Sequence, residues 1–177
     1  MAAVVIAIVA FRSENRRARF ENARALHHDL TTGEVGAART IIGNLHYGGL
    51  TPSDSRRVGP DELTAYFTVL WCFERIEAGR TALLRGALRT DGTNDEAVGY
   101  LDALIAWHVA EFACGFAVAR SRLATTANAD VSDGSSSAAF WRLLQAMQER
   151  GMVDPLYRAG SCPGPGCPCS CHSPSLP

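Results

Sequence analysis

Two pairs of side chains have the types and spacing of metal ligands in a helical bundle. Glu74 and Glu77 lie about one turn apart in one predicted helix, and His108 and Glu111 lie about one turn apart in the next. Carboxylates and imidazoles on facing helices are the usual ligands of di-iron and di-manganese centres. If these two helices pack antiparallel, the four side chains meet in mid-bundle as a candidate iron or manganese site.

The same side chains also have a structural interpretation, because the metal pattern is incomplete. A di-iron bundle needs Glu-x-x-His on two helices, whereas this chain has Glu-x-x-Glu once and His-x-x-Glu once. A buried carboxylate needs a partner, so Glu74 or Glu77 is then expected to pair with an arginine. Arg24 and Arg39 are the candidates for that arginine. In this interpretation His108 is a hydrogen-bonded core residue.

A second group of possible ligands lies in the C-terminal segment. The group comprises Cys162, Cys167, Cys169, Cys171 and His172. Thiolates and imidazole bind zinc and copper, but structural zinc sites space their cysteines as C-x-x-C pairs. The C-x4-C-x-C-x-C spacing is typical of a loose chelating tract, and the alternative is a low-complexity extension without a function. Five of the eight prolines lie in 161–177, and we expect a disordered tail over 153–177.

Other catalytic and ligand patterns are excluded or weak. All 17 basic residues are Arg, so the chain has no lysine for a phosphate-binding loop or a Schiff base. No G-x-S-x-G, G-x-G-x-x-G, H-E-x-x-H or EF-hand pattern occurs. His27 and His28 point about 100° apart on a helix, so they cannot share a metal and are expected at the surface. The formal net charge of −1 provides no basic field for nucleic acid. We expect no catalytic residue, no bound cofactor and no nucleic-acid partner.

The elements that position these side chains are all helical, because apolar residues recur at helical spacing and no period-two strand is evident. Thr31-Thr32-Gly33-Glu34 has the spacing of a capping box, and Pro60 followed by Asp61 is typical of a helix start. A linker is expected over 130–137. The predicted helices are 2–30, 31–48, 60–89, 94–124 and 138–150. The pattern therefore predicts an all-α, up-and-down bundle of four to five helices, with a long antiparallel central pair and a disordered C-terminal tail.

The N-terminus has ten consecutive apolar residues, Ala2–Phe11, followed at once by Arg12, Arg16, Arg17 and Arg19. Ten helical residues reach about 15 Å, half of a bilayer core of roughly 30 Å, so the segment as written cannot span a membrane. Apolar residues followed by arginines are typical of the cytoplasmic end of a transmembrane helix. We expect that the true translation start lies upstream of Met1, so that the outer half of a membrane anchor is missing from this sequence. The alternative is a first helix that buries its apolar end in the core.

Three further segments, together with the apolar N-terminal segment, resemble a known protein family. They are HHDLTTGEVGAART at 27–40, DELTAYFTVLWCFERIEAG at 61–79 and ALIAWHVAEFACG at 103–115. With the N-terminal segment, they resemble an uncharacterised bacterial, actinobacterial family that has one N-terminal transmembrane helix and a cytosolic helical domain. The resemblance implies a location at the plasma membrane. The family has no assigned activity that would carry over.

The sequence thus predicts three segments and one leading function. Residues 1–11 are a truncated transmembrane or apolar anchor, 12–152 a helical bundle, and 153–177 the tail. We expect a non-enzymatic domain that acts through contacts with an unknown protein and touches membrane lipid through its N-terminal segment. Its location is the inner (plasma) membrane with the bundle in the cytoplasm, or the cytoplasm if Met1 is the true start. The alternatives are a di-iron-like bundle and soft-metal chelation by the tail.

Overall fold

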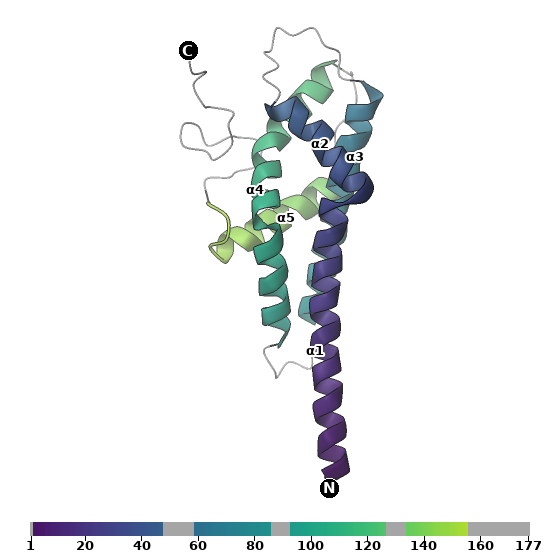
Figure 1. The fold of residues 1–177 in the computed structure, drawn as a ribbon. Coiled ribbons are helices and arrows are strands. Elements are labelled where there is room, and N and C mark those ends of the chain that lie inside the picture. Colours follow the sequence, from purple (N-terminus) through teal and green to yellow (C-terminus); the bar gives the residue numbers. More distant parts are fainter. Residues whose placement is uncertain (1, 48–58, 86–92, 127–133, 156–177) are drawn as a thin grey trace, which may run out of the picture.

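The computed structural model describes residues 2–47, 59–85, 93–126 and 134–155, and the helices in these residues confirm the all-α prediction. The predicted tail falls outside the described residues from 156 onward. In chain order the helices are α1 (Ala2–Thr31), α2 (Gly33–Tyr47), α3 (Pro60–Arg85), α4 (Thr93–Thr126) and α5 (Gly134–Glu149) (Figure 1).

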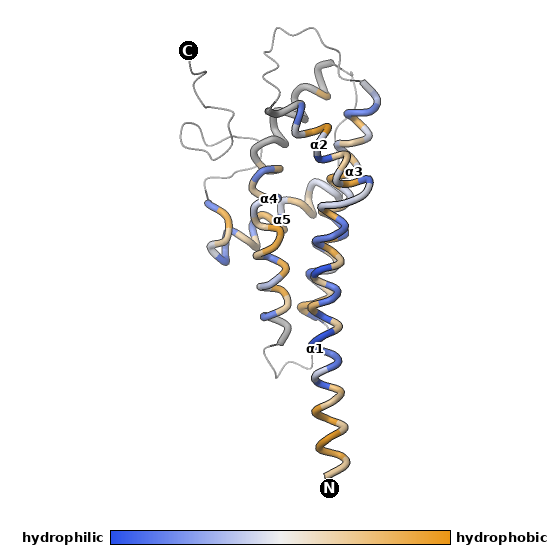
Figure 2. Tube along the Cα trace, in the orientation of Figure 1, coloured by the Kyte–Doolittle hydropathy of each residue, from blue (hydrophilic) through white to orange (hydrophobic). Residues whose placement is uncertain are grey.

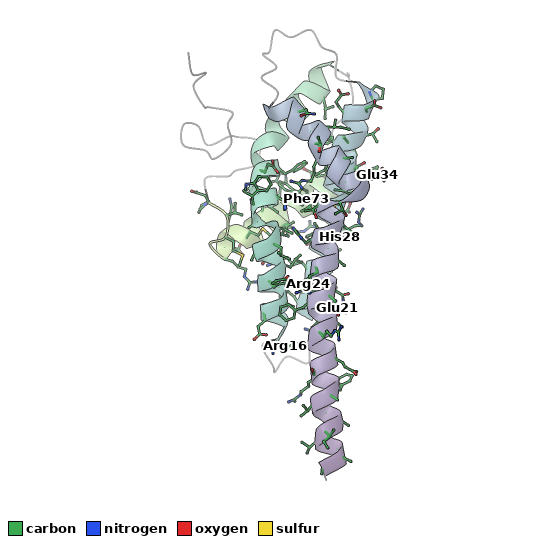
Figure 3. The ribbon with its side chains drawn as sticks, viewed as in Figure 1. Arg16, Glu21, Arg24, His28, Glu34 and Phe73 are labelled. Atoms are coloured by element: carbon green, nitrogen blue, oxygen red, sulfur yellow. The ribbon has the colours of Figure 1, made fainter. Side chains whose placement is uncertain are left out.

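Helices α1 and α4 lie side by side and run in the same direction. Arg16 near the start of the contact forms an ion pair with Glu96, at 2.9 Å between Nη2 and Oε2. Further along both helices, the rings of His27 and His108 have their centroids 5.7 Å apart. Figure 3 shows Arg16 on the side of α1 that faces α4. The parallel arrangement means that successive turns of α1 meet successive turns of α4.

Helix α3 runs antiparallel to α4, as the sequence predicted for the central pair. Arg80 near the end of α3 bonds Asp102 near the start of α4. In the middle of both helices, the rings of Phe73 and Phe112 lie 5.1 Å apart between centroids. Figure 3 shows Phe73 between the helices. Going up α4 from Asp102 to Phe112, the contacted residue of α3 moves back from Arg80 to Phe73. These two contacts fix the register of the antiparallel pair.

The junction between α1 and α2 differs from the predicted capping box. The hydroxyl of Thr32 donates to the carbonyl oxygen of His28 at 2.8 Å, and the hydroxyl of Thr31 donates to that of His27 at 3.0 Å. Both threonines therefore complete the last turn of α1 and do not cap α2. Gly33 follows with a φ of 58°, a conformation that residues with a side chain rarely adopt. The chain bends there and continues as α2.

Helix α5 crosses α3 and α4 and closes the aromatic core. The ring of Phe140 lies 5.0 Å from that of Phe73 and 5.1 Å from that of Phe112, centroid to centroid. The predicted linker over 130–137 is wrong in its second half, because α5 begins at Gly134 and both Ser136 and Ser137 are buried. Serine is a weak helix former, and packing against α3 outweighs this preference.

The apolar N-terminal end of α1 projects past the rest of the bundle, as the orange end of the tube in Figure 2 shows. Its six largest side chains are 47% to 68% exposed: Val4, Val5, Ile6, Ile8, Val9 and Phe11. The alternative in which this end is buried in the core is therefore wrong. Across the described ranges, no helix is both long enough and apolar enough to cross a membrane, in agreement with the expectation that Ala2–Phe11 cannot span one.

Candidate functional site

The two carboxylates of α3 are held by side chains of α5. The hydroxyl of Ser136 donates to Oε2 of Glu74 at 2.6 Å, and Nε of Arg142 donates to Oε1 of Glu77 at 3.2 Å. The side chain of Glu77 is 23% exposed, so the pair is partly shielded from water. Both carboxylates therefore have protein partners that attach α5 to α3.

The arginines predicted as their partners bind elsewhere. Arg24 donates from Nε to the hydroxyl of Tyr100 at 3.1 Å, on the α4 side of α1 (Figure 3). Arg39 donates from Nη2 to Oε2 of Glu111 at 3.0 Å, with both side chains mostly shielded from water. The partly shielded carboxylate of Glu77 does have an arginine partner, as in the structural interpretation, but that partner is Arg142 of α5.

His108 faces α1, where its ring lies against that of His27. Its Nδ1 atom is buried and has no hydrogen-bond partner in the part of the chain that the structure describes. Burial, the charge of Arg39 and the neighbouring His27 together lower the pKa of His108 to about 4. The imidazole is therefore neutral at neutral pH. Among the residues that the structure describes, the hydrogen bond expected of a core histidine is not formed at Nδ1 of His108.

The candidate ligands of the bundle contact three different helices. Glu74 and Glu77 contact α5, whereas His108 lies against α1 and Glu111 against α2. Within residues 2–47, 59–85, 93–126 and 134–155, no three His, Cys, Asp or Glu side chains are grouped so that they could hold a metal ion. The candidate ligands of the tail, Cys162, Cys167, Cys169, Cys171 and His172, lie outside the described residues.

Asp102 is a buried charge that the sequence interpretation missed. Its side chain is 0% exposed and receives hydrogen bonds from Arg80 at 2.9 and 3.0 Å and from Arg150 at 3.3 Å. The three residues join α3, α4 and the residue that follows α5. A signal was present in the sequence, because Asp102 has the helical spacing of buried Val98 and Ile105. An acidic residue in an apolar stripe indicates a buried ion pair.

Two large aromatic side chains are exposed on the bundle. Trp71 on α3 is 53% exposed and Trp107 on α4 is 63% exposed. Trp71 stacks on Phe67, with the ring centroids 5.8 Å apart, and the guanidinium of Arg39 lies 6.0 Å above the ring of Trp107. Exposed aromatic residues next to charged groups are typical of protein contact surfaces.

Cys72 is a buried core residue. Its side chain is 0% exposed on α3, and burial raises the pKa of its thiol to about 11. A thiol with such a pKa is neither a ready nucleophile nor a ready metal ligand.

Comparison of the chain with protein-family models, with curated proteins and with solved structures gave no match. The function must therefore be inferred from the residues of this chain and their geometry.

Proposed function

We propose that this protein is a non-enzymatic helical domain that attaches to a membrane through residues 2–11 and acts through protein contacts. The observation that supports the proposal is the exposed apolar end of α1. Ile6 is 68% exposed and Phe11 66%, and the large side chains between them are also exposed. Removal of the six large apolar side chains of this end from water is worth on the order of 5 to 10 kcal/mol. A lipid layer offers that removal to a helix that is apolar on all sides.

The length of the segment suits insertion into a single leaflet. Ten helical residues measure about 15 Å, close to half of a bilayer core of about 30 Å. Arg12 and Arg17 follow the apolar segment, and both are exposed. At the depth where the apolar residues end, these side chains reach the lipid phosphates, and each contributes on the order of 1 kcal/mol at an anionic surface. Burial of the apolar side chains and attraction of the arginines to phosphate therefore both favour binding of α1 to the membrane.

The arginines also give the attachment a direction. Cytoplasmic segments next to a membrane carry an excess of arginine and lysine. Arg12, Arg16, Arg17 and Arg19 all lie on the bundle side of the apolar segment. We therefore place the bundle on the cytoplasmic side of the plasma membrane, with the axis of α1 directed toward the lipid.

The protein contact is assigned to the exposed tryptophans. Trp107 is the more exposed of the two, and Arg39 beside it adds a charged group to the same surface. Trp and Arg are the residue types that contribute most binding energy in protein interfaces. The partner that binds Trp107 and Arg39 is then a protein located at the same face of the membrane as the bundle.

A vesicle-binding measurement tests the attachment. The full chain is sedimented with vesicles of phosphatidylcholine and phosphatidylglycerol. We expect wild type to co-sediment and Ile6→Asp to bind at least about ten-fold more weakly, because a buried carboxylate in lipid is unfavourable. Trp71→Asp is the control, since Trp71 is an exposed apolar residue of α3 and lies more than three helical turns before Leu83, which lies beside Asn15 of α1. Absence of binding by wild type, or an equal loss with Trp71→Asp, would contradict the proposal.

A site-specific cross-link tests the protein contact. A photo-reactive residue replaces Trp107 in the source cells, and the control position is the exposed Gln145 on α5. We expect a discrete cross-linked product from position 107 that position 145 does not give. The same products from both positions, or none from position 107, would count against this surface.

A further inference from the structure

A groove lies between α1 and α3, close to the apolar end of α1 that Figure 2 shows in orange. Its volume is about 440 Å³, which is in the range of small-molecule sites. The polar residues of its α1 wall include Asn15, Arg19 and Asn22, and Leu83 belongs to its α3 wall. Asn15 lies only four residues, or about 6 Å, beyond Phe11. The groove therefore begins directly after the apolar segment.

Arg19 gives the groove a positive charge that is mostly buried. Only 7% of this residue is exposed, whereas the side chain of Arg17 is 82% exposed. Salt screens a buried charge less than an exposed one, and the lower dielectric around a buried cation strengthens its attraction for an anion. The amides of Asn15 and Asn22, one turn before and one turn after Arg19, are hydrogen-bond donors on the same groove. The groove thus offers one cation and two amide groups to a ligand with anionic oxygens.

An acidic residue also lines the groove, at its far end. Asp29 lies ten residues beyond Arg19, which is about 15 Å along α1. This distance is nearly twice the Debye length of about 8 Å at physiological salt, and Asp29 is exposed. Its charge therefore has little influence on an anion beside Arg19, and the end of the groove nearer to Phe11 is the end that favours anions.

The α3 wall at this end of the groove is apolar. Gly79 of α3 faces Leu26, and α3 runs antiparallel to α1, so later residues of α3 face earlier residues of α1. Ala82 and Leu83 therefore lie on the side of the groove toward the apolar end of α1. An apolar wall next to a cation suits a phosphate that carries glycerol and acyl chains, because a free phosphate ion has no apolar surface to bury there.

The depth of the groove matches the headgroups of a lipid layer. Outside the hydrocarbon core, the headgroup region of each leaflet is roughly 5 to 7 Å thick. If residues 2–11 are inserted, Asn15 lies about 6 Å above the core, among the headgroups. Helix side chains lean toward the N-terminus, which directs Arg19 toward the same level.

We propose that this groove binds the phosphate of one anionic phospholipid, with Arg19 as the counter-charge and Asn15 and Asn22 as hydrogen-bond donors. Ala82 and Leu83 contact the glycerol and the first acyl carbons of the same lipid. This site rests on the proposed attachment of α1 to the membrane, and it adds a specific lipid to that attachment. The exposed arginines attract headgroups in general, whereas the groove holds a single lipid molecule.

A soluble short-chain lipid tests the groove separately from the attachment. The ligand is dihexanoyl phosphatidylglycerol below its micelle concentration, and the protein is the full chain with Ile6→Asp, which removes the proposed insertion. In a titration followed by NMR, we expect the amide signals of the groove residues to shift and to saturate with a dissociation constant near or below about 1 mM. Inorganic phosphate is expected to bind at least about ten-fold more weakly, since it buries no apolar surface. Equal binding of inorganic phosphate would assign the groove to free phosphate and overturn the lipid site.

Ala82→Glu tests the location of the site and leaves Arg19 in place, so the result does not depend on whether the fold tolerates Arg19→Gln. Its carboxylate would repel the lipid phosphate, and we expect lipid affinity to fall about five-fold or more. Ala103→Glu is the matched control. Ala103 is an exposed alanine of α4 outside the groove, and it follows Asp102, whose bond to Arg80 places it at nearly the same level of the bundle as Ala82. Its change is expected to lower affinity by less than about two-fold.

The lipid site and the membrane attachment fail in different experiments. If wild type sediments with vesicles but the short-chain lipid causes no saturable shift, the groove proposal is overturned and the attachment stands. If the short-chain lipid binds and Ala82→Glu weakens it, the groove is supported, even where vesicle binding by wild type is absent and the attachment is contradicted. Equal effects of Ala82→Glu and Ala103→Glu would overturn the groove as the binding site.

Discussion

Arg80 donates two hydrogen bonds to the carboxylate of Asp102, at 2.9 Å from Nε and 3.0 Å from Nη2. The guanidinium is only 13% exposed and the carboxylate 0%. Bidentate pairs of this kind fix the relative position of two helices as well as their separation. Arg150 adds a third hydrogen bond at 3.3 Å, so the end of the α5 segment is tied to the same carboxylate.

Asp102→Ala is expected to lower the free energy of unfolding by about 3 to 5 kcal/mol, because the change leaves Arg80 largely buried without its counter-charge. Urea unfolding followed by circular dichroism measures the effect. Glu21→Ala is the control, because it breaks the exposed pair with Arg17 on α1 and is expected to cost at most about 0.5 kcal/mol. Equal effects of the two changes would show that Asp102 does not stabilise the bundle in this way.

Gly79 of α3 lies against the side chain of Leu26 on α1. A Cβ placed on Gly79 would lie 2.6 Å from Cδ1 of Leu26, whereas one on Gly99 would lie 3.6 Å from Nη2 of Arg150. Alanine raises helix propensity by about 1 kcal/mol at both positions. Only Gly79→Ala also overpacks a helix contact, at a cost of about 1 to 3 kcal/mol. We therefore expect Gly79→Ala to be less stable than Gly99→Ala by that amount in thermal or urea unfolding. Equal stability of the two variants would exclude a close contact at Gly79.

Membrane attachment is expected to depend on anionic lipid and on salt. Arg12→Gln and Arg17→Gln should each weaken binding to phosphatidylglycerol-containing vesicles by about five-fold, which corresponds to roughly 1 kcal/mol per arginine. Arg75→Gln is the control, since Arg75 is exposed on α3, away from the apolar end of α1. Vesicle sedimentation at several salt concentrations measures the effect. An equal loss with Arg75→Gln would indicate a general charge effect and no contact of α1 with headgroups.

Stability is expected to fall on mild acidification because of His108. Burial, Arg39 and His27 lower the pKa of this residue from 6.5 to about 4, and Glu111 lies one turn away. As the pH falls, the unfolded chain takes up this proton first, near pH 6.5. The contribution of neutral His108 is therefore complete above about pH 6.5 and is lost as the pH falls toward 4.

The difference in unfolding free energy between wild type and His108→Gln isolates this contribution. It is expected to change by on the order of 1 to 2 kcal/mol between pH 7 and pH 5, because glutamine does not titrate in that range. Urea unfolding of both proteins at the two pH values provides the measurement. A difference that is the same at pH 7 and pH 5 would mean that His108 titrates normally in the folded protein.

Much of the fold was predictable because helix formation depends on local features. Pro60 begins α3 as predicted, and the predicted start of α4 near Asn94 is one residue from the observed Thr93. Proline in the first turn and regular apolar spacing act over a few residues, so they can be read without knowledge of the packing. The start of α5 was missed because its first residues are serines, whose weak helix preference is outweighed by burial against α3.

The sequence by itself determined the helices, the apolar end with its arginines, and which face of each helix carries apolar residues. These properties follow from neighbours along the chain. Only the tertiary structure determined which side chains contact one another across the helices. Glu77 pairs with Arg142, Asp102 with Arg80, and His27 lies against His108. Helical spacing shows which side chains share a face, but it does not show which helix packs on that face or in which register. Those depend on packing between segments that are far apart in sequence.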